Sequence, residues 1–139
     1  MRSTNMIRLF LAGLLIAYGL SACSPDVTPV AEAEYSAKIV GDWQGTVGGM
    51  NERISFGADG RFVSQVRPGG FISNTLSQDV TGTIRGTWAI EGKSITLNIS
   101  SAEDERVLNK TTTSTIESFK PNELLVRSNN AGTSRFARL

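Results

Sequence analysis

Short β-rich runs, broken at close intervals by turn residues, dominate the chain from residue 39 onward. The breaks hold Gly, Asn, Asp and Pro, which accept the backbone angles of tight turns. Eight strands are expected, near residues 40–47, 52–56, 61–67, 80–90, 94–100, 107–119, 123–127 and 134–139. Strands this closely spaced predict an all-β domain in which neighbours pair as antiparallel hairpins.

Apolar residues recur at every second position of these runs, so one face of the sheet is hydrophobic. The predicted inward residues are Ile54, Phe56, Phe62, Val66, Ile84, Trp88, Ile90, Ile95, Leu97 and Ile99. Gly45, Gly82 and Gly86 lie within predicted strands, where glycine permits a sharp bend. Closing such a sheet removes its exposed edges. We therefore predict a small closed antiparallel β-barrel of about eight strands over residues 39–139.

The N-terminus has the order of a secretory leader. Arg2 and Arg8 precede an uncharged run at residues 9–20, and small residues follow at 21–24. A run of roughly 12 residues rises about 18 Å as a helix, whereas about 20 residues are needed to cross a bilayer. Residues 1–22 are therefore predicted to be a cleaved signal peptide and not a transmembrane helix.

The leader ends in Leu20-Ser21-Ala22-Cys23, which resembles the lipobox of bacterial lipoproteins. The resemblance implies cleavage before Cys23 and attachment of lipid, palmitate included, to its sulfur. Cys23 is the one cysteine of the chain, so no disulfide competes for it. Several acyl chains would anchor the protein durably. Ser24 is not the Asp that would imply inner-membrane retention, so we expect the outer membrane, facing the periplasm.

Residues 23–38 are predicted to be the lipidated cysteine and a flexible tether, because Pro25 and Pro29 stand in a stretch with little apolar periodicity. A helical turn or two is expected within residues 31–38, which hold several Ala and Glu and no Gly.

Charge and residue types argue against most chemistry. Without Arg2 and Arg8, 12 basic residues face 13 acids and are scattered, which argues against nucleic-acid binding. The chain has no histidine, so the usual general base and a common zinc ligand are missing. Glu103-Asp104-Glu105 is the one acidic cluster and is interpreted as a solvated loop. We expect a binding protein that is not an enzyme, with no metal and no cofactor.

Three motifs resemble those of small bacterial lipocalin-like domains: Gly41-Asp42-Trp43, the hairpin at residues 54–62 and the segment 86–92. The ending Phe136-Ala137-Arg138-Leu139 adds to the likeness. The resemblance implies an up-and-down barrel in which a first-strand tryptophan plugs one end and a last-strand arginine packs across its ring. Trp43 and Arg138 match these positions, with Arg135 as the second choice. The strands are shorter than those of full lipocalins, which argues against a large calyx.

The barrel interior is the natural binding site, filled either by side chains alone or by one small apolar ligand. The candidate ligand-binding residues are Phe56, Phe62, Phe71, Trp88 and Leu97. Residues 68–79 are long for a hairpin and are interpreted either as a lid or as a surface loop in which Phe71 packs locally.

A protein-binding module is the competing interpretation, in which a solid barrel engages a periplasmic protein through its loops or its tether. Small periplasmic barrels that inhibit metalloproteases are similar in outline, but they usually carry a disulfide, which this chain lacks. A filled interior would favour this class, and a continuous cavity would favour a ligand carrier.

Replacing Cys23 with Ser should abolish acylation, because a serine hydroxyl does not substitute for the thiol that accepts the diacylglycerol. Incorporation of radioactive palmitate and membrane fractionation in a bacterial host would measure the effect against the wild-type chain. Equal labelling and equal membrane retention of Cys23→Ser would contradict the lipoprotein interpretation.

Overall fold

The structure, a computed structural model, describes residues 27–47 and 50–139. The predicted signal peptide, Cys23 and the start of the predicted tether lie outside these residues. The strands are β1 (Gly41–Val47), β2 (Met50–Phe56), β3 (Arg61–Val66), β4 (Gly82–Glu91), β5 (Ser94–Ala102), β6 (Thr111–Lys120), β7 (Glu123–Ser128) and β8 (Gly132–Arg138). Short helical elements are η1 (Glu32–Glu34), α1 (Tyr35–Lys38), α2 (Phe71–Leu76) and η2 (Glu105–Val107). Within the described residues, no helix is long and apolar enough to cross a membrane.

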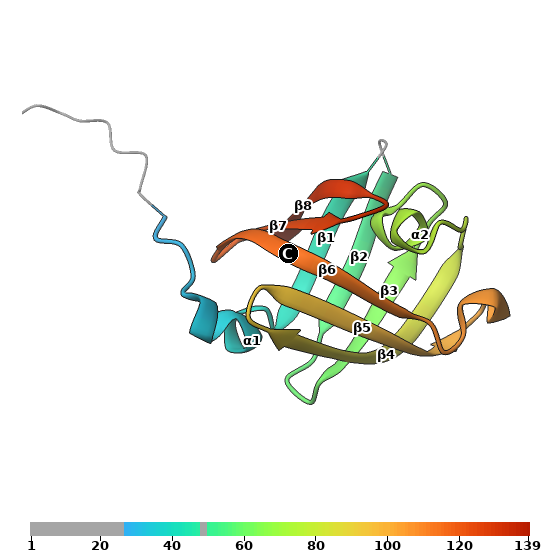
Figure 1. Ribbon diagram of the computed structural model, residues 1–139, viewed down its shortest axis with the longest axis horizontal. Helices are drawn as coiled ribbons and strands as arrows, with labels where there is room; N and C mark the ends of the chain where they lie inside the picture. The colour runs from blue at the N-terminus through green and yellow to red at the C-terminus, as the bar shows by residue number, and fades with distance from the viewer. Residues whose placement is uncertain (1–26, 48–49) are drawn as a thin grey trace, which may run out of the picture.

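Every strand pairs antiparallel with the next, and β8 pairs with β1, so the sheet closes on itself (Figure 1). The predicted up-and-down barrel of eight strands is confirmed. All pairing partners of these strands lie between residues 41 and 138, as does nearly all of the hydrophobic core. The segment 27–139 therefore holds the contacts that a barrel needs to fold on its own.

The strand boundaries differ from prediction by up to four residues, and the later starts of the fourth and sixth strands have a clear structural cause. The fourth strand begins at Gly82 instead of Val80, because the Val80 N–H bonds to the Ser73 hydroxyl and not to a neighbouring strand. The sixth begins at Thr111, because Val107 ends the short helix η2. The helical turns expected within residues 31–38 are present as η1 and α1.

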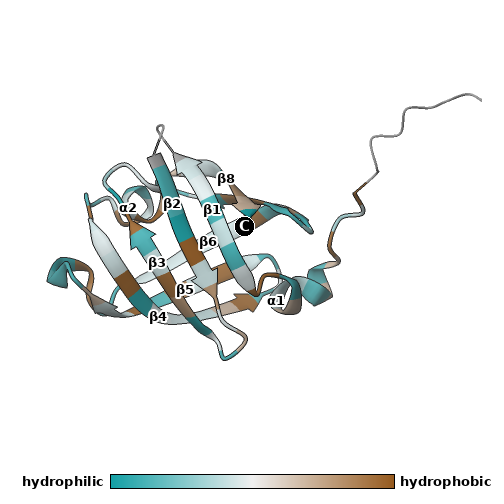
Figure 2. Cartoon of the chain, turned by 180° about the vertical axis from the view of Figure 1, so that it is seen from behind, coloured by the Kyte–Doolittle hydropathy of each residue, from teal (hydrophilic) through white to brown (hydrophobic). Residues whose placement is uncertain are grey.

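Alternation of buried and exposed residues follows from the closed sheet. Along β3 and β7 every second side chain is buried, and hydrophobic and hydrophilic bands alternate along β2 and β4 (Figure 2). The curvature depends on two of the predicted glycines. Gly86 sits at a bulge between β4 and β5, where an added Cβ would lie 1.8 Å from the Asn98 carbonyl oxygen. At Gly45, an added Cβ would lie 2.6 Å from the Phe136 ring.

One end of the barrel is closed around Trp43, which is completely buried. Its Nε1 donates a hydrogen bond to the Ile39 carbonyl at 2.8 Å, and the Arg138 guanidinium lies 4.3 Å from the ring centre. The same guanidinium donates to the carbonyl oxygens of Lys38, Val40 and Pro121. Arg138 thus joins the last strand to the segment that precedes the first.

The segment just before β1 also packs on this end (Figure 1). Tyr35 is buried and stacks on Phe119 with ring centres 5.2 Å apart, and Phe119 in turn meets the Trp43 ring edge to face. The Val30 N–H bonds to the Phe119 carbonyl at 2.9 Å. Part of the predicted tether is therefore attached to the barrel, and the chain enters the domain at the Trp43 end.

Replacing Arg138 with Ala should lower the free energy of unfolding by about 2–4 kcal/mol, because the stack on Trp43 and three charge-assisted hydrogen bonds are lost. Arg135→Ala is the matched control on the same strand. Its exposed ion pair with Glu123 predicts a loss below about 1 kcal/mol. Urea denaturation of both variants measures the difference, and equal losses would contradict the role given to Arg138.

Candidate functional site

The barrel interior contains a narrow cavity of about 30 Å³. Its lining is formed by Glu52, Ile54, Phe56, Ser64, Phe71, Ile72, Ile95, Leu97, Thr112, Ser114, Leu124, Val126 and Phe136. This volume suits about one water molecule and is far below the roughly 300–1,000 Å³ of drug-sized ligand pockets. The interior as it stands is therefore almost filled by side chains.

Three of the five residues predicted to bind a ligand line this cavity: Phe56, Phe71 and Leu97. Phe62 is buried in the core but does not line it. Trp88 is half-buried, lies edge to face against Phe56 with ring centres 5.6 Å apart, and donates from Nε1 to a backbone carbonyl. Trp88 thus supports the cavity wall through its contact with Phe56.

Glu52 is the residue that distinguishes this cavity, and sequence reasoning missed it. Its side chain is 1 % exposed, and Oε2 accepts a hydrogen bond from the Phe71 N–H at 2.7 Å. Oε1 is buried without a hydrogen-bond partner among the described residues. Burial raises the pKa of the carboxyl to about 7, and the backbone N–H groups of Phe71 and Ile72 offset only part of that rise. A partly ionised acid therefore sits in apolar surroundings near neutral pH.

The strand pattern contains the signal that places Glu52 inside. Residues 52, 54 and 56 are alternate positions of β2, so Glu52 shares the inward face of Ile54 and Phe56. Its partner on β1 is Gly45, whose missing side chain leaves room for the Phe136 ring. A charged residue at an inward position of an apolar strand face indicates a functional site.

Hydroxyl groups add a second polar element to the wall. Ser64 donates its hydroxyl hydrogen to the Arg53 carbonyl at 2.8 Å, which leaves its oxygen lone pairs free to accept. Thr112 and Ser114 on β6 are buried and line the cavity, while Thr111 and Thr113 are exposed. The cavity thus combines one carboxyl, three hydroxyls and an otherwise apolar lining.

Helix α2 covers the barrel end opposite Trp43, where the sequence predicted a lid or a loop (Figure 1). Phe71 and Ile72 at its start are buried and line the cavity. The Phe71 ring meets Phe136 edge to face, with centres 5.7 Å apart. Phe71 and Ile72 form a plug in the mouth of the barrel, and the Glu52 carboxylate accepts a hydrogen bond from the first N–H group of α2.

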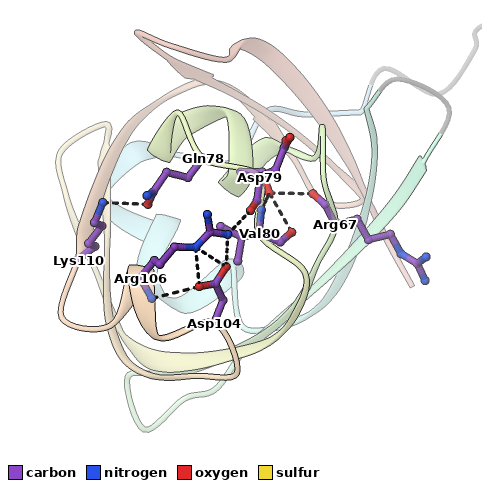
Figure 3. Close-up of polar contacts among 8 residues, drawn as sticks. Arg67, Gln78, Asp79, Val80, Asp104, Arg106 and Lys110 are labelled. Atoms are coloured by element: carbon purple, nitrogen blue, oxygen red, sulfur yellow. Dashed lines mark hydrogen bonds and ion pairs between the residues drawn. The ribbon is translucent and has the colours of Figure 1, made fainter.

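The segment after α2 is tied to the barrel by several polar contacts (Figure 3). The buried Ser73 hydroxyl bonds to the backbone of Arg67 and Val80, and Lys110 donates to the Gln78 side chain at 2.9 Å.

Arg106 adds a second attachment. It donates to the Asp79 carbonyl and forms an ion pair with Asp104. These contacts hold α2 and the segment after it against the barrel, and Glu52 holds the first N–H group of the helix.

The acidic cluster at residues 103–105 takes part in this anchoring. Hydrogen bonds from Arg106 lower the pKa of Asp104, and its carboxylate caps η2. No group of three metal-binding side chains occurs in the part of the chain that the structure describes.

No family model and no curated protein matches this sequence. Among solved structures, the chain is similar to a lipocalin-like protein from Bacteroides uniformis ATCC 8492, with 15 % identity, 73 % of this chain and 99 % of that chain covered, and a TM-score of 0.49. It is also similar to an uncharacterized protein from Bacteroides eggerthii DSM 20697, with 13 % identity, the same two coverages and a TM-score of 0.46. The topology of the barrel itself is the up-and-down architecture that the sequence resemblance predicts.

Stability should fall as pH rises because of Glu52. The unfolded chain loses this proton near pH 4.5 and the folded chain near pH 7, so the folded state holds more protons between these values. We expect the free energy of unfolding to drop by about 2 kcal/mol between about pH 5.5 and pH 8. The chain has no histidine to obscure the effect. Urea denaturation across this range should show the slope in wild type and not in Glu52→Gln; the same slope in both would contradict the assignment.

Proposed function

We propose that this protein is a lipid-anchored barrel of the cell envelope that binds one small, largely apolar molecule between Glu52 and the plug formed by α2. The observation that carries the proposal is the buried Glu52 oxygen, which has no partner among the described residues, in a cavity whose lining is otherwise mainly apolar. A mostly apolar site with few convergent polar groups and a perturbed pKa is the common form of a small-molecule site.

The ligand must replace part of the plug, because the cavity of about 30 Å³ has no room for more than a water-sized group. Movement of the Phe71 side chain would open this space. Helix α2 has six residues, and a helix this short has little stability apart from its tertiary contacts. Moving the side chain at its start therefore costs less than opening a strand ladder.

The proposed anchor is the lipid on Cys23, supported by the lipobox-like sequence around it. The chain enters the barrel at the Trp43 end, where Val30 bonds to Phe119, and α2 covers the opposite end (Figure 1). A tether attached in this way would leave the α2 end accessible from the periplasm. Outer-membrane placement is part of the same proposal.

A protein-binding module is the second candidate, and the nearly filled interior is the observation that favours it. In that case the barrel would be a rigid support and its loops would contact a periplasmic protein.

Native mass spectrometry of residues 27–139, incubated with a bacterial envelope extract and purified again, should show a bound small molecule. Occupancy should rise by about tenfold in Phe71→Ala, because the ligand no longer has to displace the ring. Leu76→Ala is the matched control, since Leu76 is also on α2 but does not line the cavity. Phe71→Leu serves as a milder variant if the alanine protein is unstable. Absence of any bound molecule from all four proteins would favour the protein-binding candidate.

A further inference from the structure

We propose that the bound molecule is a small apolar primary amine whose ammonium group donates to Oε1 of Glu52. This inference rests on the proposed function and specifies the chemical class of the ligand. It follows from which polar atoms of the cavity remain unused.

The free polar positions in the cavity include acceptors that lack a donor. Glu52 Oε1 has no partner among the described residues, and the Ser64 hydroxyl has already donated its hydrogen to Arg53. An ammonium group has three donors and no acceptor, which complements these positions. A carboxylate or phosphate head would be repelled by the negative charge of Glu52, and an alcohol would supply only one donor.

Charge leads to the same class of ligand. Of the described residues that line the cavity, Glu52 alone is titratable, and the side chains that line it with Glu52 from every neighbouring element are uncharged. An ionised group in such surroundings is stable only when it is paired. An ammonium head would supply the missing positive charge, so ligand binding should return the pKa of Glu52 toward its ordinary value.

Because Glu52 has two carboxylate oxygens, it can bind the ammonium group without releasing α2. The Phe71 N–H occupies Oε2, which leaves Oε1 for the ligand. The Phe71 ring can therefore leave the barrel while its backbone stays bound. The apolar body of the amine would then lie against the wall formed by Leu97, Leu124 and Val126.

Three probes with one alkyl chain and different heads test the assignment: n-hexylamine, 1-hexanol and hexanoate. Each is titrated at about pH 8 into residues 27–139 and followed by NMR chemical shifts. We expect hexylamine to bind wild type most tightly and to lose at least about tenfold in affinity in Glu52→Gln, because a charge-assisted hydrogen bond disappears. Glu117→Gln is the control, since Glu117 is exposed on β6 and pairs with Arg127; its affinity should be unchanged.

The outcomes separate this inference from the proposed function. Equal binding of hexylamine and hexanol, or equal hexylamine binding by wild type and Glu52→Gln, overturns the amine assignment and leaves an apolar ligand site. No binding of any probe to wild type or to Phe71→Ala overturns the proposed function as well. The carboxyl carbon shift of Glu52 gives a second readout: hexylamine should lower its pKa, and an unchanged titration with hexylamine bound contradicts the proposal.

Discussion

Closure of the sheet between β8 and β1 is the constraint on which the rest of the structure depends. Arg138 lies over Trp43 and bonds to carbonyl oxygens on both sides of the seam, including that of Val40, 98 residues earlier in the chain. Without this pairing both outer strands would have free edges and Trp43 would be exposed. The cavity exists because the wall around it is closed, and Glu52 is buried for the same reason.

Burial of Glu52 lowers the stability of the folded protein and at the same time prepares the proposed binding site. An acid in an apolar interior disfavours the folded state near neutral pH, and an apolar side chain at this position would avoid that cost. The same burial leaves Oε1 available and directs the Phe71 N–H of α2 onto Oε2. Local departures from the most stable arrangement concentrate at functional sites, and this carboxyl is such a departure.

Much of the fold was predictable, and the reasons for the misses are physical. Strands were found because alternation is a local property of the chain, and the Trp43 and Arg138 positions followed from short motifs at its two ends. Helix α2 was not predicted because six residues are too few to show a helical period. Its form depends on burial of Phe71 and on the contacts of Ser73.

Residue order and composition were enough to predict the eight antiparallel strands and their inward faces, because alternation along a strand is a local property of the chain. Three features are visible in the folded structure alone: the nearly filled barrel, the plug that α2 forms at one end, and the Glu52 oxygen that has no partner among the described residues. The volume of a cavity and the burial of a carboxyl depend on how side chains from distant strands pack together, and no local pattern records that packing.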